Sequence, residues 1–214
     1  MWKGYAGKIL EVDLSSGTIE RVDLDRETAE KYIGGKGFGI HTLFHRLPAG
    51  CDPLSPENVL VFATGPLTGS AAPASGRLEL CTKSPATGLW LDSNAGGSLG
   101  PELKYAGYDA LIISGAAESP VLLLIEDERV AIVEADAYWG LDTIATHRKI
   151  KTDYSIDHRV ACIGQSGELL SPLANVQTEY RSFGRGGAGA VLGAKKLKAV
   201  VVHGSGGIKT ADSD

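Results

Sequence analysis

The stretch that decides the fold is Arg181 to Gly193, RSFGRGGAGAVLG, which holds five glycines, two arginines and no acid. Glycine has no Cβ, so such a segment turns at positive φ without strain and lets a ligand approach its backbone. Exposed backbone N–H groups, together with the guanidinium groups of Arg181 and Arg185, are typical of an anion site. Taken alone the pattern is weak, because a plain turn between two elements has the same composition.

A second stretch, Ser75 to Gly100 (SGRLELCTKSPATGLWLDSNAGGSLG), repeats these features with Arg77 and the pair Gly96–Gly97. Around each stretch lies the same series: a buried strand, a glycine turn, an arginine, a glycine pair, a run from Leu-Gly to Leu-Lys, and a strand ending in glycine. The series runs over residues 59–115 and again over 160–204. We interpret it as an internal duplication. Two arginine-and-glycine loops facing one cleft would suit a ligand with two anionic ends.

Hydrophobic periodicity and turn residues set the expected elements. Short Gly-containing or acidic turns predict hairpins over 6–24 and 121–134. Helices are expected over 25–33, 38–47, 99–106, 144–151 and 190–195, and further strands over 59–63, 78–82, 89–92, 110–114, 160–163, 174–177 and 199–203. Helices and strands do not alternate strictly. The predicted fold class is therefore α+β: two mixed β-sheets with short helices, internally duplicated, in a layered or barrel-like arrangement.

Composition excludes several classes of protein. The net charge of -5 over 214 residues argues against nucleic acid as a partner. No segment approaches the ~20 apolar residues of a membrane helix, and the N-terminus lacks the features of a signal peptide. The cysteines, Cys51, Cys81 and Cys162, are widely separated. This spacing favours buried thiols in a reducing cytoplasm over a disulfide framework or a metal cluster held by this chain alone.

Two further patterns have competing interpretations. The glycine-rich segment 34–39, GGKGFG, resembles a dinucleotide fingerprint, but it follows an expected helix rather than a buried strand and has the wrong spacing. His41 and His45 lie one helical turn apart, which suits a metal. Because no third ligand is evident, we favour a packing or solvated role for both.

Four longer motifs in sequence order carry a family resemblance: SPENVLVFATGPLTG, SGRLELCTKSPATG, SNAGGSLGPELKYAGYDALIISG and FGRGGAGAVLGAKKLKAVVVHG. Together with GKILEVDLSSG near the start, they resemble the N-terminal domain of the tungsten-containing aldehyde ferredoxin oxidoreductases. The resemblance covers residues 1–209, which we treat as one domain, with 210–214 as a flexible tail and a truncation point before further domains.

The resemblance implies a cofactor and its contacts. In that family the domain supports tungsten, or molybdenum, bound by two molybdopterins whose phosphates are bridged by Mg²⁺. By matching position, the main-chain carbonyls of Asn94 and Ser182 are expected to bind the Mg²⁺. Arg77 is expected to lie beside a pterin and near a [4Fe–4S] cluster, and Gly96, Arg181 and Gly184 to complete the pterin contacts. The family often has alanine where this chain has Ser182, a change that a backbone contact should tolerate.

The resemblance also implies what lies outside this chain. The cluster cysteines and the acid–base residues belong to later domains, so the isolated chain is expected to be inactive. The full-length enzyme would oxidise an aldehyde and pass electrons through the cluster to ferredoxin in the cytoplasm, and a homodimer is left open. Two alternatives remain: a pterin-binding module or subunit without catalysis, as in a relative of the benzoyl-CoA reductases, and a metal-free domain that binds phosphate esters.

Overall fold

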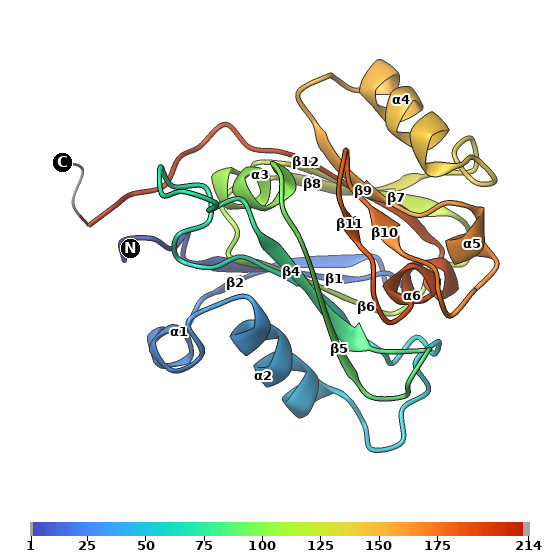
Figure 1. Cartoon of the computed structure of the whole chain (residues 1–214), viewed down its shortest axis with the longest axis horizontal. Coiled ribbons are helices and arrows are strands. Elements are labelled where there is room, and N and C mark those ends of the chain that lie inside the picture. The colour runs from blue at the N-terminus through green and yellow to red at the C-terminus, as the bar shows by residue number, and fades with distance from the viewer. Residues whose placement is uncertain (1, 212–214) are drawn as a thin grey trace.

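The computed structural model describes residues 2–211, which form two mixed six-stranded sheets and six helices (Figure 1). The first sheet holds β1 (Lys8–Asp13), β2 (Thr18–Asp23), β3 (Leu60–Ala63), β4 (Leu78–Lys83), β5 (Trp90–Ala95) and β6 (Ala110–Ser114). The second holds β7 (Val121–Glu126), β8 (Arg129–Glu134), β9 (Arg159–Cys162), β10 (Val176–Gln177), β11 (Ser182–Phe183) and β12 (Leu197–His203). The helices are α1 (Arg26–Tyr32), α2 (Lys36–Arg46), α3 (Leu99–Tyr105), α4 (Thr143–Asp153), α5 (Gln165–Glu168) and α6 (Ala188–Ala194).

The two sheets have the same topology. Their strand orders are β2-β1-β6-β3-β4-β5 and, read in the matching direction, β8-β7-β12-β9-β10-β11. In each sheet one pair is parallel, β1 with β6 and β7 with β12, and every other pair is antiparallel. This agreement supports the predicted duplication and confirms the α+β class with two mixed sheets. Neither sheet closes on itself, so the layered alternative is correct and the barrel-like one is not.

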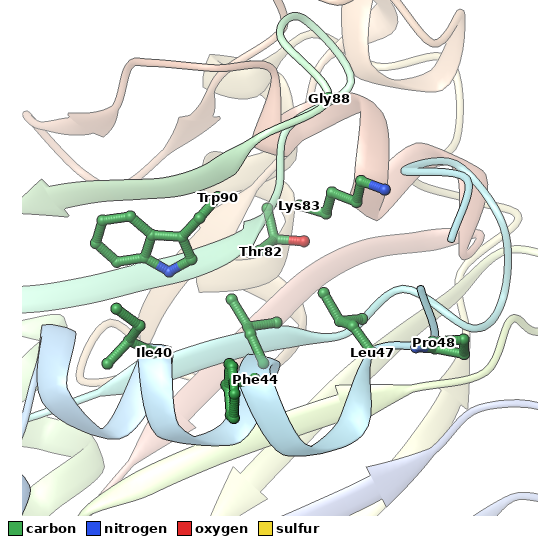
Figure 2. Close-up of a pocket in the computed structure, with 9 residues that line it drawn as sticks. Ile40, Phe44, Leu47, Pro48, Thr82, Lys83, Gly88 and Trp90 are labelled. Atoms are coloured by element: carbon green, nitrogen blue, oxygen red, sulfur yellow. The ribbon is translucent and has the colours of Figure 1, made fainter. Parts of the chain in front are cut away.

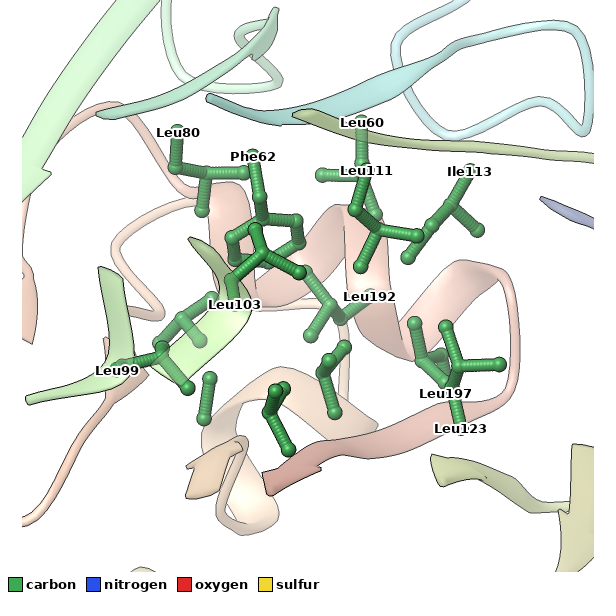
Figure 3. Close-up of a cluster of buried hydrophobic side chains, with 14 of the residues drawn as sticks. Leu60, Phe62, Leu80, Leu99, Leu103, Leu111, Ile113, Leu123, Leu192 and Leu197 are labelled. Carbon is green, nitrogen blue, oxygen red and sulfur yellow. The ribbon is translucent and has the colours of Figure 1, made fainter. Parts of the chain in front are cut away.

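The core sits between the sheets. Alternate residues of β3, β6 and β7 face inward and pack with α3 and α6, as Figure 3 shows for Phe62, Leu103 and Leu192. Residues of the opposite parity, such as Val61 on β3, face outward and are covered by α1 and α2. The outer face of the second sheet is covered by α4. Because β3 is buried on both faces, it reads in the sequence as a continuous apolar run.

The glycine cluster at 34–39 is explained by packing. A Cβ on Gly37 would lie 1.9 Å from the carbonyl oxygen of Tyr32, and one on Gly39 would lie 2.2 Å from the sulfur of Cys81. Helix α2 therefore packs so closely on the end of α1 and on strand β4 that no side chain fits at these two positions. The glycines serve helix packing, and α2 begins at Lys36, before the expected residue 38.

Three local predictions need correction. The turn expected after β9 contains α5, and the loop around Ser182 contains β11, a strand of two residues whose existence depends on pairing with β10. Helix α6 begins at Ala188, two residues before the prediction. Of the predicted tail 210–214, residues 212–214 lie outside the described residues.

Candidate functional site

The two halves of the duplication meet edge to edge. Strands β5 and β11 are the outer strands of their sheets and lie side by side. The backbone N–H of Arg185 donates to Ser93 Oγ at 3.4 Å, and Ser84 Oγ donates to the carbonyl of Gly186 at 2.7 Å. Beneath this junction the rings of Phe62 and Phe183 meet edge to face with centroids 5.8 Å apart. The loop that follows β11 therefore lies against the start of β5, and the loop that follows β5 lies beside Arg181, just before β11.

Asn94 and Ser182 occupy equivalent positions in the two sheets. Asn94 pairs with Glu79 and Ser182 with Gln177. Those partners in turn pair with the equivalent residues Ala63 and Cys162 of β3 and β9. The duplication thus places Asn94 and Ser182, the two residues expected to supply carbonyl oxygens, at the same step of their β-ladders.

The main chains of Asn94 and Ser182 both point off the open edges of the sheets. The β4–β5 hairpin is closed by a hydrogen bond from Ser84 N to Leu89 O at 2.8 Å, and the β10–β11 hairpin by one from Thr178 N to Arg181 O at 2.8 Å. Hydrogen-bonded and non-hydrogen-bonded pairs alternate from there. Asn94 and Ser182 both fall in non-hydrogen-bonded pairs, so their N–H and C=O groups face away from β4 and β10. Their carbonyls are available to an outside ligand.

Arg77 lies on the same side of the molecule as this junction. Its guanidinium donates to Asn94 Oδ1, and a Cβ on the preceding Gly76 would be 2.4 Å from the carbonyl oxygen of Gly97. The loop that carries Arg77 thus packs directly on the loop after β5. Arg77 is thereby linked to Asn94 on β5, the strand that lies beside Ser182 and β11.

Arg77 and Arg181 are not equivalent, so the repeat predicted from the sequence is wrong at this point. Arg77 precedes β4, whose counterpart is β10, and the residue before β10 is Asn175. Arg181 precedes β11, the counterpart of β5. The helices that follow, α3 and α6, and the last strands, β6 and β12, do correspond. The two arginines therefore approach the junction from different places in the repeat.

Gly96 and Arg181 line one open cavity of about 520 Å³, between the start of α3 and the β10–β11 hairpin. A Cβ on Gly96 would meet nothing within 4 Å, so a ligand has room to approach its backbone. Gly184 is exposed, and its nearest neighbour for a Cβ is Ser182 Oγ at 3.4 Å. The structure thus brings together Arg77 with Asn94, Gly96 with Arg181, and Ser182 with Gly184. Arg77 is not among the residues that line the cavity.

Sequence reasoning missed several residues of the cavity. Besides Gly97 and Ser98 the lining comprises Lys151, Ile156, Asp157, Arg159, Thr178, Glu179 and Tyr180. They come from the end of α4, the start of β9 and a hairpin tip, which carry no recognisable motif. The one available signal was the adjacency of Glu179 and Tyr180 to Arg181.

Positive charge at the junction is not neutralised by acids. Within residues 2–211, no ion pair of 4.0 Å or less involves Arg77, Arg181 or Arg185. The pKa of Glu79, the partner of Asn94, is raised to about 7, mainly by burial and also by nearby Asp92, although Lys36 and Arg77 oppose the shift. A group with two phosphates would meet guanidinium donors here rather than fixed carboxylates.

The oxygen atoms available as metal ligands at the junction suit Mg²⁺ better than a transition metal. Mg²⁺ prefers oxygen ligands and retains waters, and carbonyl groups on two facing edges supply such oxygens. In the described part of the chain there is no cluster of three or more His, Cys, Asp or Glu side chains placed to hold a metal. The three cysteines are buried and free, as predicted. His41 stacks between Tyr32 and His45, with ring centroids 4.4 Å apart on each side.

A separate groove of about 310 Å³ lies between α2 and the β4–β5 hairpin (Figure 2). Its walls are apolar, with Ile40, Phe44 and Trp90 prominent among them. The cation in its lining, Lys83, donates its Nζ to the carbonyl of Cys51. This groove does not suit an anionic ligand, so the β5–β11 junction remains the candidate site. None of the helices in the described residues has the length and apolarity needed to span a bilayer.

The fold and the junction define a duplicated α+β domain with two neighbouring strand edges and, within the described residues, arginines that form no ion pair. Residues 9–204 match the family model described as aldehyde ferredoxin oxidoreductase, N-terminal domain. The chain belongs to this family, as its motifs indicated.

Relatives along the whole chain support the assignment. The tungsten-containing aldehyde ferredoxin oxidoreductase of Pyrococcus horikoshii is 47% identical over 211 residues, which cover 98% of this chain and 35% of the relative. The aliphatic sulfonate oxidoreductase WOR-like subunit of Pyrococcus furiosus is 36% identical, over 94% of this chain and 35% of the relative. A chain of the active-site complex BamBC of benzoyl coenzyme A reductase, solved with 1,5-dienoyl-CoA, has a TM-score of 0.96 and 41% identity, over 98% of this chain and 32% of that one. The chain thus spans about a third of the length of these proteins.

Proposed function

We propose that this domain carries one face of a tungsten, or molybdenum, bis-molybdopterin cofactor at the β5–β11 junction. The observation that carries the proposal is the equivalence of Asn94 and Ser182, whose main-chain carbonyls point off two neighbouring sheet edges. A cofactor with two similar arms and two phosphates needs paired contacts of this kind, and a duplicated domain supplies them.

Each of the remaining residues has a defined task in this proposal. The carbonyls of Asn94 and Ser182 would hold the Mg²⁺ that accompanies the phosphates of the cofactor. Gly96 and Gly184, at equivalent steps beyond them, leave the backbone open to the two pterins. Arg181 lines the cavity beside Gly96, and Arg77, oriented by Asn94 Oδ1, supplies charge on the other side. The bound metal would supply two-electron redox chemistry, and the residues of this chain bind and orient the group that holds it.

The full-length protein, in this proposal, oxidises an aldehyde to its carboxylic acid and passes two electrons through a [4Fe–4S] cluster to ferredoxin in the cytoplasm. The name of the relative with 47% identity supports an aldehyde as the substrate and ferredoxin as the electron acceptor. The cluster would need ligands from outside this chain, because its three cysteines are buried and far apart in sequence. The isolated domain would then bind the cofactor but would not oxidise aldehydes.

A second candidate is a role in another reaction class on the same cofactor. The benzoyl coenzyme A reductase chain matches with a TM-score of 0.96 and the sulfonate oxidoreductase subunit with 36% identity, so this domain architecture occurs in proteins named for different substrates. The domain described here holds the proposed cofactor, whereas the substrate pocket would lie mostly elsewhere.

The test is a composition measurement on the protein translated from the complete reading frame, purified from cells supplied with both tungstate and molybdate. Tungsten, molybdenum, magnesium and iron are measured by mass spectrometry, and pterin by the fluorescence of its oxidised form. Tungsten or molybdenum together with pterin and Mg²⁺ supports the proposal. Pterin-free protein contradicts it and favours a metal-free phosphate-ester domain. Dye reduction with a panel of aldehydes then separates aldehyde oxidation from the second candidate.

A further inference from the structure

The cavity beside Arg181 contains a second arginine, Arg159, for which neither the motifs nor the duplication predicted a role. The cavity has a glycine wall from the first half of the chain, Gly96 and Gly97, and a cationic wall from the second half. Arg159 is the first residue of β9, where its backbone is held by pairing with Val202 of β12. Its position is therefore fixed by the sheet rather than by a loop.

The alternation of β9 sends Arg159 toward the first half of the chain. Val160 and Cys162 pack in the outer core beneath α4, whereas Ala161 packs in the central core between the sheets. Since successive side chains of a strand point to opposite faces, Arg159 shares the inward face of Ala161. Beyond the edge of the central core, that face opens onto the cavity at the start of α3.

Most donors of the Arg159 guanidinium have no partner within the described residues. Its Nη1 donates to the carbonyl of Ile156 at 3.2 Å, and the guanidinium takes part in no ion pair there. The guanidinium of Arg181 is similar, with one bond from Nη1 to the carbonyl of Tyr180 at 3.1 Å. A guanidinium has five donors in a fixed fork, so both arginines keep most of their donors for a ligand.

The other charges around the cavity do not neutralise the two arginines. Glu179 faces Lys151, with 3.9 Å between the carboxylate oxygen and the amine, and its carboxylate also accepts from Val160 N at 3.4 Å. The Lys151 amine is occupied by the carbonyls of Ile156 and His158. Asp157 is exposed on the rim, where its carboxylate accepts from Ser155 Oγ at 3.5 Å. Two guanidinium charges thus share the cavity with one uncommitted carboxylate, a balance that favours an anion.

We propose that Arg159 and Arg181 together form a phosphate-binding site against the Gly96–Gly97 backbone, and that Arg159 anchors the phosphate-ester group of the cofactor arm on this side. The proposal rests on the proposed function for the identity of that group. Phosphate oxygens match the arginine fork in geometry and charge. The glycine wall allows the ester to reach the backbone without meeting a side chain.

The test uses the 214-residue chain and inorganic phosphate as the probe, followed by amide chemical shifts in ¹H–¹⁵N NMR spectra. We expect saturable shifts at Gly96, Gly97 and residues 178–181, with a dissociation constant that rises with salt. Arg159→Gln should weaken binding by about tenfold or more, because a charge-assisted fork is lost. Arg159→Lys, which keeps the charge but not the fork, should be intermediate. The matched control is Arg26→Gln, at an exposed arginine of α1 paired with Glu30, which should bind as the unaltered chain does.

Equal affinity in Arg159→Gln and Arg26→Gln would overturn the proposal, as would shifts confined to other surfaces. Thermal unfolding of each variant shows whether the fold is kept, and Arg159→Lys provides the comparison if Arg159→Gln is unstable. In the full-length protein, Arg159→Gln should also lower the pterin retained per chain. If phosphate binding depends on Arg159 but the full-length protein carries no pterin, the proposed function is wrong. The anion site at Arg159 and Arg181 would still be supported.

Discussion

Asn94 and Ser182 sit at the same step of two equivalent ladders, on edge strands that lie next to each other, and both turn their main-chain carbonyls away from their own sheets. Edge strands ordinarily risk uncontrolled pairing because their backbone groups are free. Here two such edges face a common space. The proposed site is therefore built from backbone, and the side chains at these two positions are expected to be replaceable.

Ser182→Ala and Asn94→Ala in the full-length protein should each leave the bound magnesium unchanged within about twofold, because the carbonyl survives either substitution. Mass spectrometry of the purified variants measures this. Asn94→Ala has one additional effect, since it removes the acceptor for Arg77. Loss of magnesium in Ser182→Ala would mean that the hydroxyl, not the carbonyl, is the ligand.

Gly96 and Gly187 should respond differently to alanine. Gly187 caps α6 at φ 80°, and a Cβ there would lie 2.4 Å from the carbonyl oxygen of Pro172. Gly187→Ala should lower the free energy of unfolding by about 1–3 kcal/mol or more, as strained backbone does. Gly96 has neither positive φ nor a neighbour within 4 Å, so Gly96→Ala should stay within about 0.5 kcal/mol. Denaturant unfolding measures both, and an equally large loss for Gly96→Ala would contradict the open space above its backbone.

The contact between Phe62 and Phe183 should hold the two halves of the domain together. Both side chains are buried, with 1% and 0% exposed, and they come from opposite sheets. Phe183→Ala should cost about 3–5 kcal/mol of unfolding free energy. A double-mutant cycle with Phe62→Ala should give a coupling of about 0.5–1.5 kcal/mol.

Phe44→Ala is the control for the aromatic pair, because 83% of that side chain is exposed on α2. It should change stability by no more than about 0.5 kcal/mol. Additive effects of the Phe62 and Phe183 substitutions, with no coupling, would show that each ring is held by its own half alone.

Lys195 should make stability depend on alkaline pH. It is 1% exposed and donates to the carbonyls of Gly115 at 2.7 Å and Pro56 at 3.1 Å. Burial lowers its pKa from 10.5 to about 8, although nearby Asp13 opposes the shift. Between these values the unfolded chain binds more protons than the folded one, so this residue makes unfolding free energy rise with pH. The difference in unfolding free energy between the unaltered chain and Lys195→Met should grow by up to about 3 kcal/mol as the pH rises between these two pKa values.

Unfolding in denaturant at about pH 7.5 and about pH 10 measures this difference for both chains. The loss of the two carbonyl contacts in Lys195→Met does not depend on pH, so it cancels from the comparison. A difference that stays constant, or shrinks as pH rises, would mean that Lys195 is not the titrating group.

Much of the fold follows from local sequence. Asp25 predicts the start of α1, and in the structure its carboxylate accepts from Thr28 N at 2.8 Å. The apolar runs predicted β3, β6, β9 and β12 within a residue or two, and the repeated series predicted two matching sheets. These features depend on contacts close in sequence, or on a pattern repeated along it, so they can be read without coordinates.

The site could be predicted only in part. Family motifs led to Arg77, Asn94, Gly96, Arg181, Ser182 and Gly184, and the structure joins Arg77 to Asn94 and places Gly96 and Arg181 in one cavity. Arg159 was missed because nothing around it in sequence resembles a motif. The mistaken pairing of Arg77 with Arg181 arose because glycine-rich loops look alike, while strand order alone shows which loops correspond.

The sequence by itself determined the family, the duplicated series and the residue types of an anion-binding loop, because turns, caps and buried strands are encoded over a few residues. Only the tertiary structure decided that β5 and β11 lie edge to edge, that the carbonyls of Asn94 and Ser182 point outward, and that Arg159 joins Arg181 in one cavity. The physical reason is that these relationships depend on ladder register and on packing between halves about ninety residues apart, and no local propensity specifies either.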